Sequence, residues 1–109
     1  MAYDERLAAR VRSALRGRED VSERKMFGGL CFLVRGRMAC GVTGDELMVH
    51  VGADLHEEAL AEPHARPMDF TGRPLRGMVY VGRGGIAAEA DLEQWVGRGV
   101  RSAESRPAR

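Results

Sequence analysis

The sequence has few aromatic residues, a single lysine, two cysteines and no long hydrophobic run. None of its apolar segments approaches the roughly 18 residues typical of a transmembrane helix. The 17 basic residues nearly balance the 16 acidic ones, and the net charge of +1 argues against a generic polyanion-binding protein. At 44% hydrophobic residues, the 109-residue chain is too apolar to be disordered. We therefore expect one small, soluble, globular domain that does not enter a membrane.

The N-terminal residues offer no targeting signal, because Asp4 and Glu5 interrupt any apolar stretch of the kind that a signal peptide requires. This pattern predicts a cytoplasmic protein. Cys31 and Cys40 are then expected to be reduced.

Hydrophobic periodicity predicts both helices and strands. Tyr3, Leu7, Val11 and Leu15 recur every four residues and indicate a helix over about 4–16. The remaining pattern predicts strands at 26–34, 37–43 and 46–51, a helix at 54–60, strands at 67–70 and 75–81, and a helix from 88 to 105. This α-β-β-β-α-β-β-α order predicts an α+β, two-layer domain with an antiparallel sheet over residues 1–105, followed by a disordered tail at 106–109.

The expected turns at 35–36 and 44–45 fix a register for the first three strands. Two-residue turns would place Cys31 opposite Cys40 and Leu33 opposite Met38, with all four side chains on one face. The other face would carry Leu30, Phe32, Val34, Ala39, Met48 and His50. This second face is too apolar to meet water, so a helix, a second protomer or a ligand should cover it.

The cysteines and histidines are the first candidates for chemistry. Opposed strand positions could make Cys31 and Cys40 a redox pair, although two small core side chains are the simpler interpretation. The spacing of the cysteines and of His50, His56 and His64 fits no metal site, and no serine nucleophile motif is present. We expect no catalytic residue, no metal and no cofactor.

Basic and glycine-rich segments are the second candidates. The loop at 82–85 precedes a helix and could hold an anion, but a flexible connection is the simpler interpretation. Arg24, Lys25, Arg73 and Arg76 could contact nucleic acid together with the basic C-terminus, although the sequence offers few exposed aromatic side chains for base stacking.

Three segments resemble the N-terminal domain of the TfoX/Sxy family: ERKMFGGL at 23–30, GRMACGV at 36–42 and PMDFTGRPLRGMVYV at 67–81. The resemblance implies an α+β fold similar to that of the type III secretion chaperones. It also implies a regulatory role, since the family takes its name from regulators of natural competence that act with the cyclic-AMP receptor protein. Those regulators carry a C-terminal helical domain, whereas we expect a stand-alone domain here. The family offers no catalytic residues to transfer.

The sequence therefore favours one function and leaves two alternatives open. The first is a non-enzymatic cytoplasmic regulatory or protein-interaction module, a homodimer or partner of another protein through the second face at Leu30, Phe32, Val34, Met48 and His50. The second is a nucleic-acid-associated regulator that uses Arg24, Lys25, Arg73 and Arg76. The third is a small-molecule or thiol redox sensor built on Cys31 and Cys40.

Overall fold

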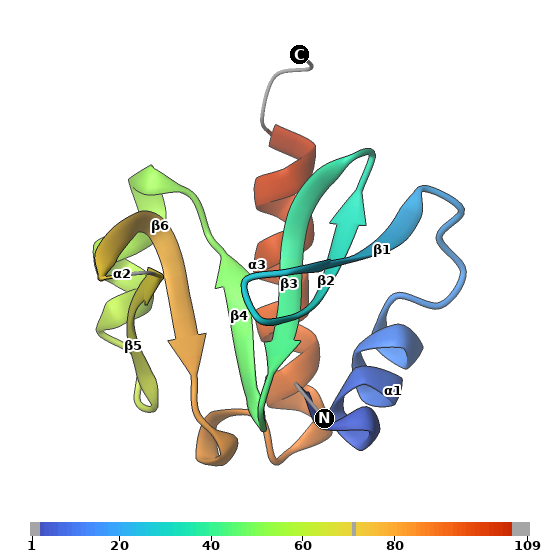
Figure 1. Cartoon of the computed structure of the whole chain (residues 1–109), viewed down its shortest axis with the longest axis horizontal. Coiled ribbons are helices and arrows are strands. Elements are labelled where there is room, and N and C mark those ends of the chain that lie inside the picture. The colour runs from blue at the N-terminus through green and yellow to red at the C-terminus, as the bar shows by residue number, and fades with distance from the viewer. Residues whose placement is uncertain (1–2, 71, 106–109) are drawn as a thin grey trace.

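The computed structural model describes residues 3–70 and 72–105 and confirms the predicted α+β class (Figure 1). Its elements are α1 (Glu5–Ala14), β1 (Val21–Met26), β2 (Gly29–Val34), β3 (Arg37–Thr43), β4 (Glu46–His50), the 3-10 turn η1 (Ala53–Leu55), α2 (His56–Leu60), β5 (Ala65–Phe70), β6 (Arg73–Val81), the 3-10 turn η2 (Arg83–Gly85) and α3 (Glu89–Ser105). The expected tail at 106–109 lies outside the described residues. Among the residues described, no helix combines the length and the hydropathy needed to cross a membrane.

The strands form one antiparallel sheet in the order β1-β2-β3-β4-β6-β5. Turns of two residues join β1 to β2, β2 to β3 and β3 to β4, as the registers Met26↔Gly29, Val34↔Arg37 and Thr43↔Glu46 show. The first two turns have positive φ at both residues, the backbone form that matches the twist of a hairpin.

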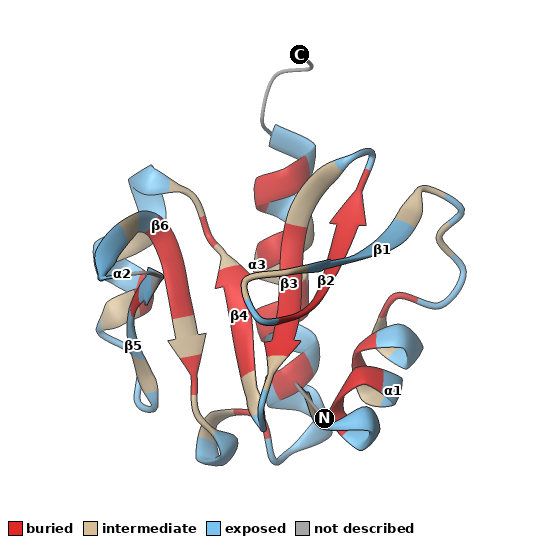
Figure 2. Ribbon diagram, in the orientation of Figure 1, coloured by how far each residue is buried: buried red, intermediate tan, exposed pale blue. Residues whose placement is uncertain are grey.

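All three helices pack on the same face of the sheet. Helix α1 begins at Asp4, whose carboxylate accepts a hydrogen bond from the Arg6 backbone N–H, and it buries Leu7 and Val11. Helix α3 contacts β3 and β4 and buries Leu92 and Trp95. The main core lies between these helices and the sheet, where Figure 2 shows the central strands as buried.

The predicted strand at 26–34 is wrong in extent, because the chain turns at Phe27 and Gly28. The residues before this turn form the additional strand β1, which pairs with β2. Its sequence, VSERKM, lacks apolar alternation because β1 is an exposed edge strand. Charged side chains suit such an edge, since they discourage pairing with another strand.

The predicted pairing of Cys31 with Cys40 is also wrong. Ala39 is an extra residue in β3, so Cys31 lies opposite Gly41 and Phe32 lies opposite Cys40. The predicted pair Leu33↔Met38 is confirmed, and in the next pair of strands Cys40 lies opposite Val49 and Val42 opposite Leu47. The bulge nevertheless separates the two cysteines, which belong to hydrophobic clusters on opposite faces of the sheet.

The bulge overturns the predicted second face as well. Leu30 and Phe32 belong to the helix-covered core, and Val34 packs with Ala103 of α3. Met48 belongs to the opposite face, and the His50 Nδ1 atom lies 2.9 Å from the Ser102 Oγ atom. The five residues of the predicted interface therefore do not share one exposed face: they divide between two faces, and Leu30, Phe32 and Val34 pack beneath this chain's own helices.

Candidate interaction surface

The sheet face opposite the helices carries a second hydrophobic cluster, which we call the methionine face. Its buried members are Cys31, Leu33, Met48, Met68 and Met78, and its half-buried members are Met26, Phe27, Met38, Leu75 and Tyr80. Half of these side chains are methionines, which are unbranched, polarizable and able to adapt their shape to a partner. None of the described helices covers this face.

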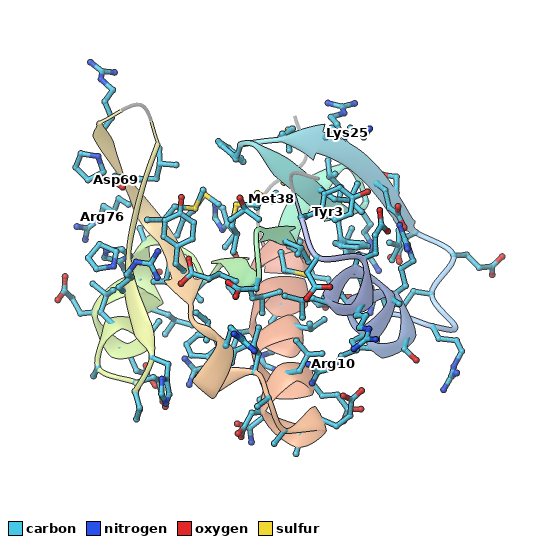
Figure 3. The ribbon with its side chains drawn as sticks, turned by 60° about the horizontal axis from the view of Figure 1, so that its bottom comes forward. Tyr3, Arg10, Lys25, Met38, Asp69 and Arg76 are labelled. Carbon is cyan, nitrogen blue, oxygen red and sulfur yellow. The ribbon has the colours of Figure 1, made fainter. Side chains whose placement is uncertain are left out.

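The sheet curves so that two hairpins stand on either side of the methionine face, and we call this face together with the two hairpins the trough (Figure 1, Figure 3). In Figure 1, β1 crosses in front of β2 and β3. Figure 3 shows the β1–β2 hairpin with Lys25 rising on one side and the β5–β6 hairpin with Asp69 and Arg76 on the other, with Met38 between them. We call the two hairpins the walls of the trough and strands β3 and β4 its floor (Figure 3).

Glycine lets side chains meet closely on this floor. A Cβ atom at Gly41 would lie 2.9 Å from the Met48 Cε atom and 3.1 Å from the Cys31 Sγ atom. Gly41 therefore provides the space into which both sulfur-containing side chains pack. A larger residue at position 41 would therefore require the Met48 and Cys31 side chains to move.

Phe27 sits at the tip of the β1–β2 hairpin in an unfavourable backbone conformation. Its φ of 55° lies in the left-handed region, where a bulky side chain is uncommon and where hairpin turns favour Asn, Asp or Gly. The half-buried ring packs against the methionine cluster. Backbone strain of this kind is maintained by surrounding contacts and is concentrated at functional positions.

An ion pair and an aromatic ring stand at the β4–β5–β6 side of the trough. The Arg66 Nη2 atom donates to the Glu46 Oε1 atom at 2.7 Å, and the guanidinium lies 4.6 Å from the centre of the Tyr80 ring. The hydrogen bond from Arg66 lowers the pKa of Glu46 against a smaller opposing effect of burial. These three residues form a preorganised polar border beside the apolar floor.

The predicted nucleic-acid residues are divided between the two walls. Arg24 and Lys25 lie on β1, whereas Arg73 and Arg76 lie on β6, and all four are exposed. None of them has an ion pair within the part of the chain that the structure describes. The structure does not bring them together into one basic patch.

The two cysteines are buried free thiols. Burial raises the pKa of Cys31 to about 11 and that of Cys40 to about 12. Reactive cysteines have the opposite environment, with a cationic neighbour and a lowered pKa. The Cys31 thiol donates a hydrogen bond to the Met26 carbonyl oxygen at 3.7 Å, and this hydrogen bond further stabilises the protonated form of the thiol.

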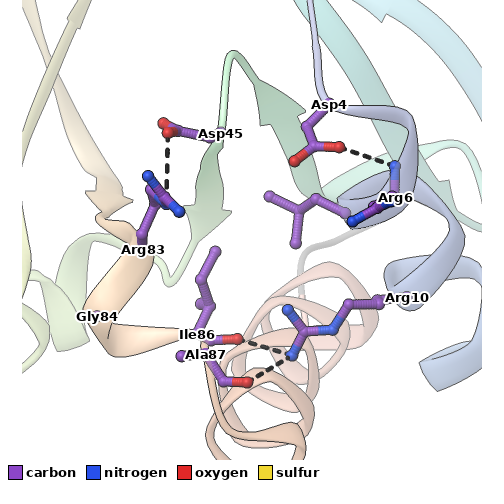
Figure 4. A pocket seen from close by; sticks show the side chains of 9 residues that line it. Asp4, Arg6, Arg10, Asp45, Arg83, Gly84, Ile86 and Ala87 are labelled. Carbon is purple, nitrogen blue, oxygen red and sulfur yellow. Dashed lines mark hydrogen bonds and ion pairs between the residues drawn. The ribbon is translucent and has the colours of Figure 1, made fainter.

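A pocket of about 580 Å³ lies between α1 and the loop that precedes α3 (Figure 4). It contains arginines that already have internal partners. Arg10 donates to the carbonyl oxygens of Ile86 and Ala87 at 2.7 and 3.2 Å, and Arg83 pairs with Asp45 at 3.6 Å. The loop at 82–85 thus serves as a tethered connection between β6 and α3.

The histidines occupy separate structural positions. His64 is exposed, with a positive φ of 70°. His56 is half-buried, and its Nδ1 atom accepts a hydrogen bond from the Gly77 backbone N–H at 3.0 Å. No group of three or more His, Cys, Asp or Glu side chains that could hold a metal occurs among the described residues.

The TfoX N-terminal domain family model matches residues 13–103, which include the whole sheet. No curated protein matches the chain. No solved structure matches it either.

Proposed function

Because the chain belongs to the TfoX N-terminal domain family, we propose that it is a non-enzymatic regulatory module that binds another protein through the methionine face. The single observation that carries this proposal is the methionine face itself, an apolar cluster with five half-buried members on the side of the sheet that the described helices leave uncovered. The family supports a regulatory module, and the trough supplies the place where such a module can make contact.

The composition of the trough supports binding rather than catalysis. Its floor is made of sulfur and hydrocarbon groups, which offer contact area but no acid, base or nucleophile at an ordinary pKa. Its half-buried members, Met26, Phe27, Met38, Leu75 and Tyr80, form a surface that can rearrange around a partner. Flexible methionine-rich surfaces are typical of proteins that bind peptide segments.

The other two expected functions have less support. The four predicted nucleic-acid residues stand on two walls with an apolar floor between them, which suits a phosphate backbone poorly. The raised pKa values of both thiols disfavour a redox sensor. Two free buried cysteines instead suit a reducing compartment, so the proposal places the protein in the cytoplasm.

Methionine methyl groups provide a direct test of the proposal. We would label the full chain with ¹³C at the methionine methyls and titrate it with acidic, basic and uncharged amphipathic peptides. We expect the Met26 and Met38 resonances to shift first, because these side chains are half-buried at the surface of the trough. If no peptide shifts any methionine resonance while the protein is folded, the methionine face is not a binding surface and the proposal is wrong.

A further inference from the structure

We propose that the occupant of the methionine face is an acidic amphipathic segment of a partner protein, with bulky apolar side chains flanked by Asp or Glu. This inference rests on the proposed function and adds the chemistry of the partner. It comes from one juxtaposition: an apolar trough stands between two walls that both carry cations without internal partners.

The register of β1 places a cation directly beside the apolar floor. Arg24 lies opposite Cys31 in the antiparallel β1–β2 pair, so their side chains are on the same face. Cys31 is a buried member of the methionine face. Arg24 is exposed, whereas Lys25 lies opposite Leu30 of the helix-covered core and is therefore on the other face of the β1 wall. The guanidinium can therefore meet a carboxylate of any segment that lies in the trough.

The opposite wall contributes Arg73 near the β5–β6 turn, whereas Arg76 points away from Met38 on the outer side of the same hairpin (Figure 3). Asp69, on the same hairpin, is the acidic residue that lies closest to them in the sequence. The other carboxylate on this side of the sheet, that of Glu46, is already neutralised by Arg66. The walls consequently carry an excess of positive charge, which favours a negatively charged partner.

These cations differ from seven other arginines of the chain, which have ion pairs. Ion pairs within the described residues involve Arg10, Arg12, Arg18, Arg35, Arg66, Arg83 and Arg98. The unpaired cations of the walls stay available for an external carboxylate. An arginine there can bind that carboxylate through two parallel hydrogen bonds.

A second copy of the chain fits this trough less well, because two identical faces would bring their positive walls together. Addition of a second copy at the β1 edge is also unfavourable. An antiparallel two-fold pairing at the middle of this strand would place either Glu23 opposite Glu23 or Arg24 opposite Arg24. Like charges at these positions disfavour the self-complementary arrangements.

Binding can be measured with three synthetic peptides of about 16 residues, a length that permits a short helix. All three would share one apolar face of Leu and Phe, and their polar faces would carry Glu, Lys or Gln. Fluorescence anisotropy with the full chain should show the Glu peptide binding at least about tenfold more tightly than the Lys peptide, with affinity that falls as salt rises. A single-stranded DNA oligonucleotide would be a fourth probe.

The variant Arg24→Glu with Lys25→Glu should reverse this preference, weakening the Glu peptide by about tenfold and strengthening the Lys peptide. The matched control is Arg16→Glu on the segment after α1, an exposed cation with no ion pair among the described residues. It should leave both affinities unchanged. Circular dichroism would confirm that each variant folds, as expected for exposed sites.

The other possible results would contradict the acidic preference, the proposed function or the identity of the occupant. Equal binding of all three peptides would refute the acidic preference and leave the methionine face as a general binding surface. No binding by any peptide would refute the proposed function together with this inference. Tight DNA binding that is lost in the variant Arg24→Glu with Lys25→Glu would identify nucleic acid, not an acidic segment, as the occupant. Self-association that depends on Met38 would identify a second copy of the chain as the occupant.

Discussion

Gly99 of helix α3 lies directly against the main chain of Ala39 in strand β3. A Cβ atom at position 99 would collide with the Ala39 carbonyl oxygen and would lie 2.8 Å from its carbonyl carbon. Ala39 is also the bulged residue that shifts the β2–β3 register. The bulge and the glycine therefore create one close contact between helix and sheet.

The substitution Gly99→Ala should destabilise the protein by about 2–4 kcal/mol, because the added methyl group has only backbone to displace. Gly97→Ala provides a matched control in the same helix, since its Cβ would meet only the Arg101 Nη1 atom, at 3.4 Å. The Gly97→Ala control should leave the stability unchanged or raise it by up to about 1 kcal/mol, because Ala has a higher helix propensity than Gly by about that amount. Urea denaturation of both variants would measure the difference, and equal stabilities would contradict the close packing.

Phe27→Asn should change the free energy of unfolding by less than about 1 kcal/mol. Asn adopts positive φ more readily than Phe, and this gain offsets the lost contacts of a half-buried ring. Phe32→Ala, in the fully buried core, should instead cost about 3–5 kcal/mol. Thermal or urea denaturation compares the two, and similar losses would show that Phe27 is an ordinary core residue rather than part of an exposed surface.

Both thiols should react slowly with a water-soluble disulfide reagent in the folded protein and rapidly after denaturation. Burial keeps them protonated, with a pKa of about 11 for Cys31 and about 12 for Cys40. Mild oxidation should form no disulfide within the chain, because the two side chains belong to clusters on opposite faces. Mass spectrometry after oxidation would reveal a linked pair, and finding one would contradict the observed register.

Stability should fall on acidification below about pH 4.5. Hydrogen bonds from arginine lower the pKa values of Glu23 and Glu46 below the ordinary 4.5, and Arg18 and Arg35 lower that of Asp20 below 3.8. The folded state therefore binds fewer protons than the unfolded state. These groups contribute stability above their ordinary pKa values and lose it as pH falls through the lowered ones.

Glu46→Gln isolates one part of this acid response. Relative to the wild type, the variant should be less stable by about 0.5 kcal/mol at pH 7, a value limited by the half-exposed Arg66 side chain, and this difference should disappear as pH falls through the lowered pKa of Glu46. Glu93→Gln is the control, because Glu93 has no ion pair among the described residues. A parallel pH dependence for wild type and Glu46→Gln, measured by urea denaturation, would contradict a contribution from this ion pair.

Regular hydrophobic spacing made most of the fold predictable. The stripes from Leu7 to Leu15 and from Leu92 to Ala103 are helical, and both helices bury those residues. The strands from β3 onward were predicted to within a few residues, because glycine and proline mark their ends. Strand β1 was missed because Glu23, Arg24 and Lys25 conceal its pattern, as expected for an edge strand.

The candidate surface was harder to predict because one residue decides which side chains share a face. The bulge at Ala39 lies where Gly99 approaches the sheet, and a contact between segments so distant in sequence leaves no local signal. Without the bulge, Phe32 and Met48 were assigned to the same face. A stronger signal was available in Met26, Met38, Met48, Met68 and Met78, which all fall in predicted strands.

The two-residue turns between the first four strands have a consequence for the order of folding. Residues 21–50 form their pairings between neighbours in the chain, and each hairpin closes only a short loop. Strand β6 pairs with β4 across a much longer separation, His50 with Met78. We therefore expect the transition state for folding to contain the four-stranded meander, with β5, β6 and α3 joining it afterwards.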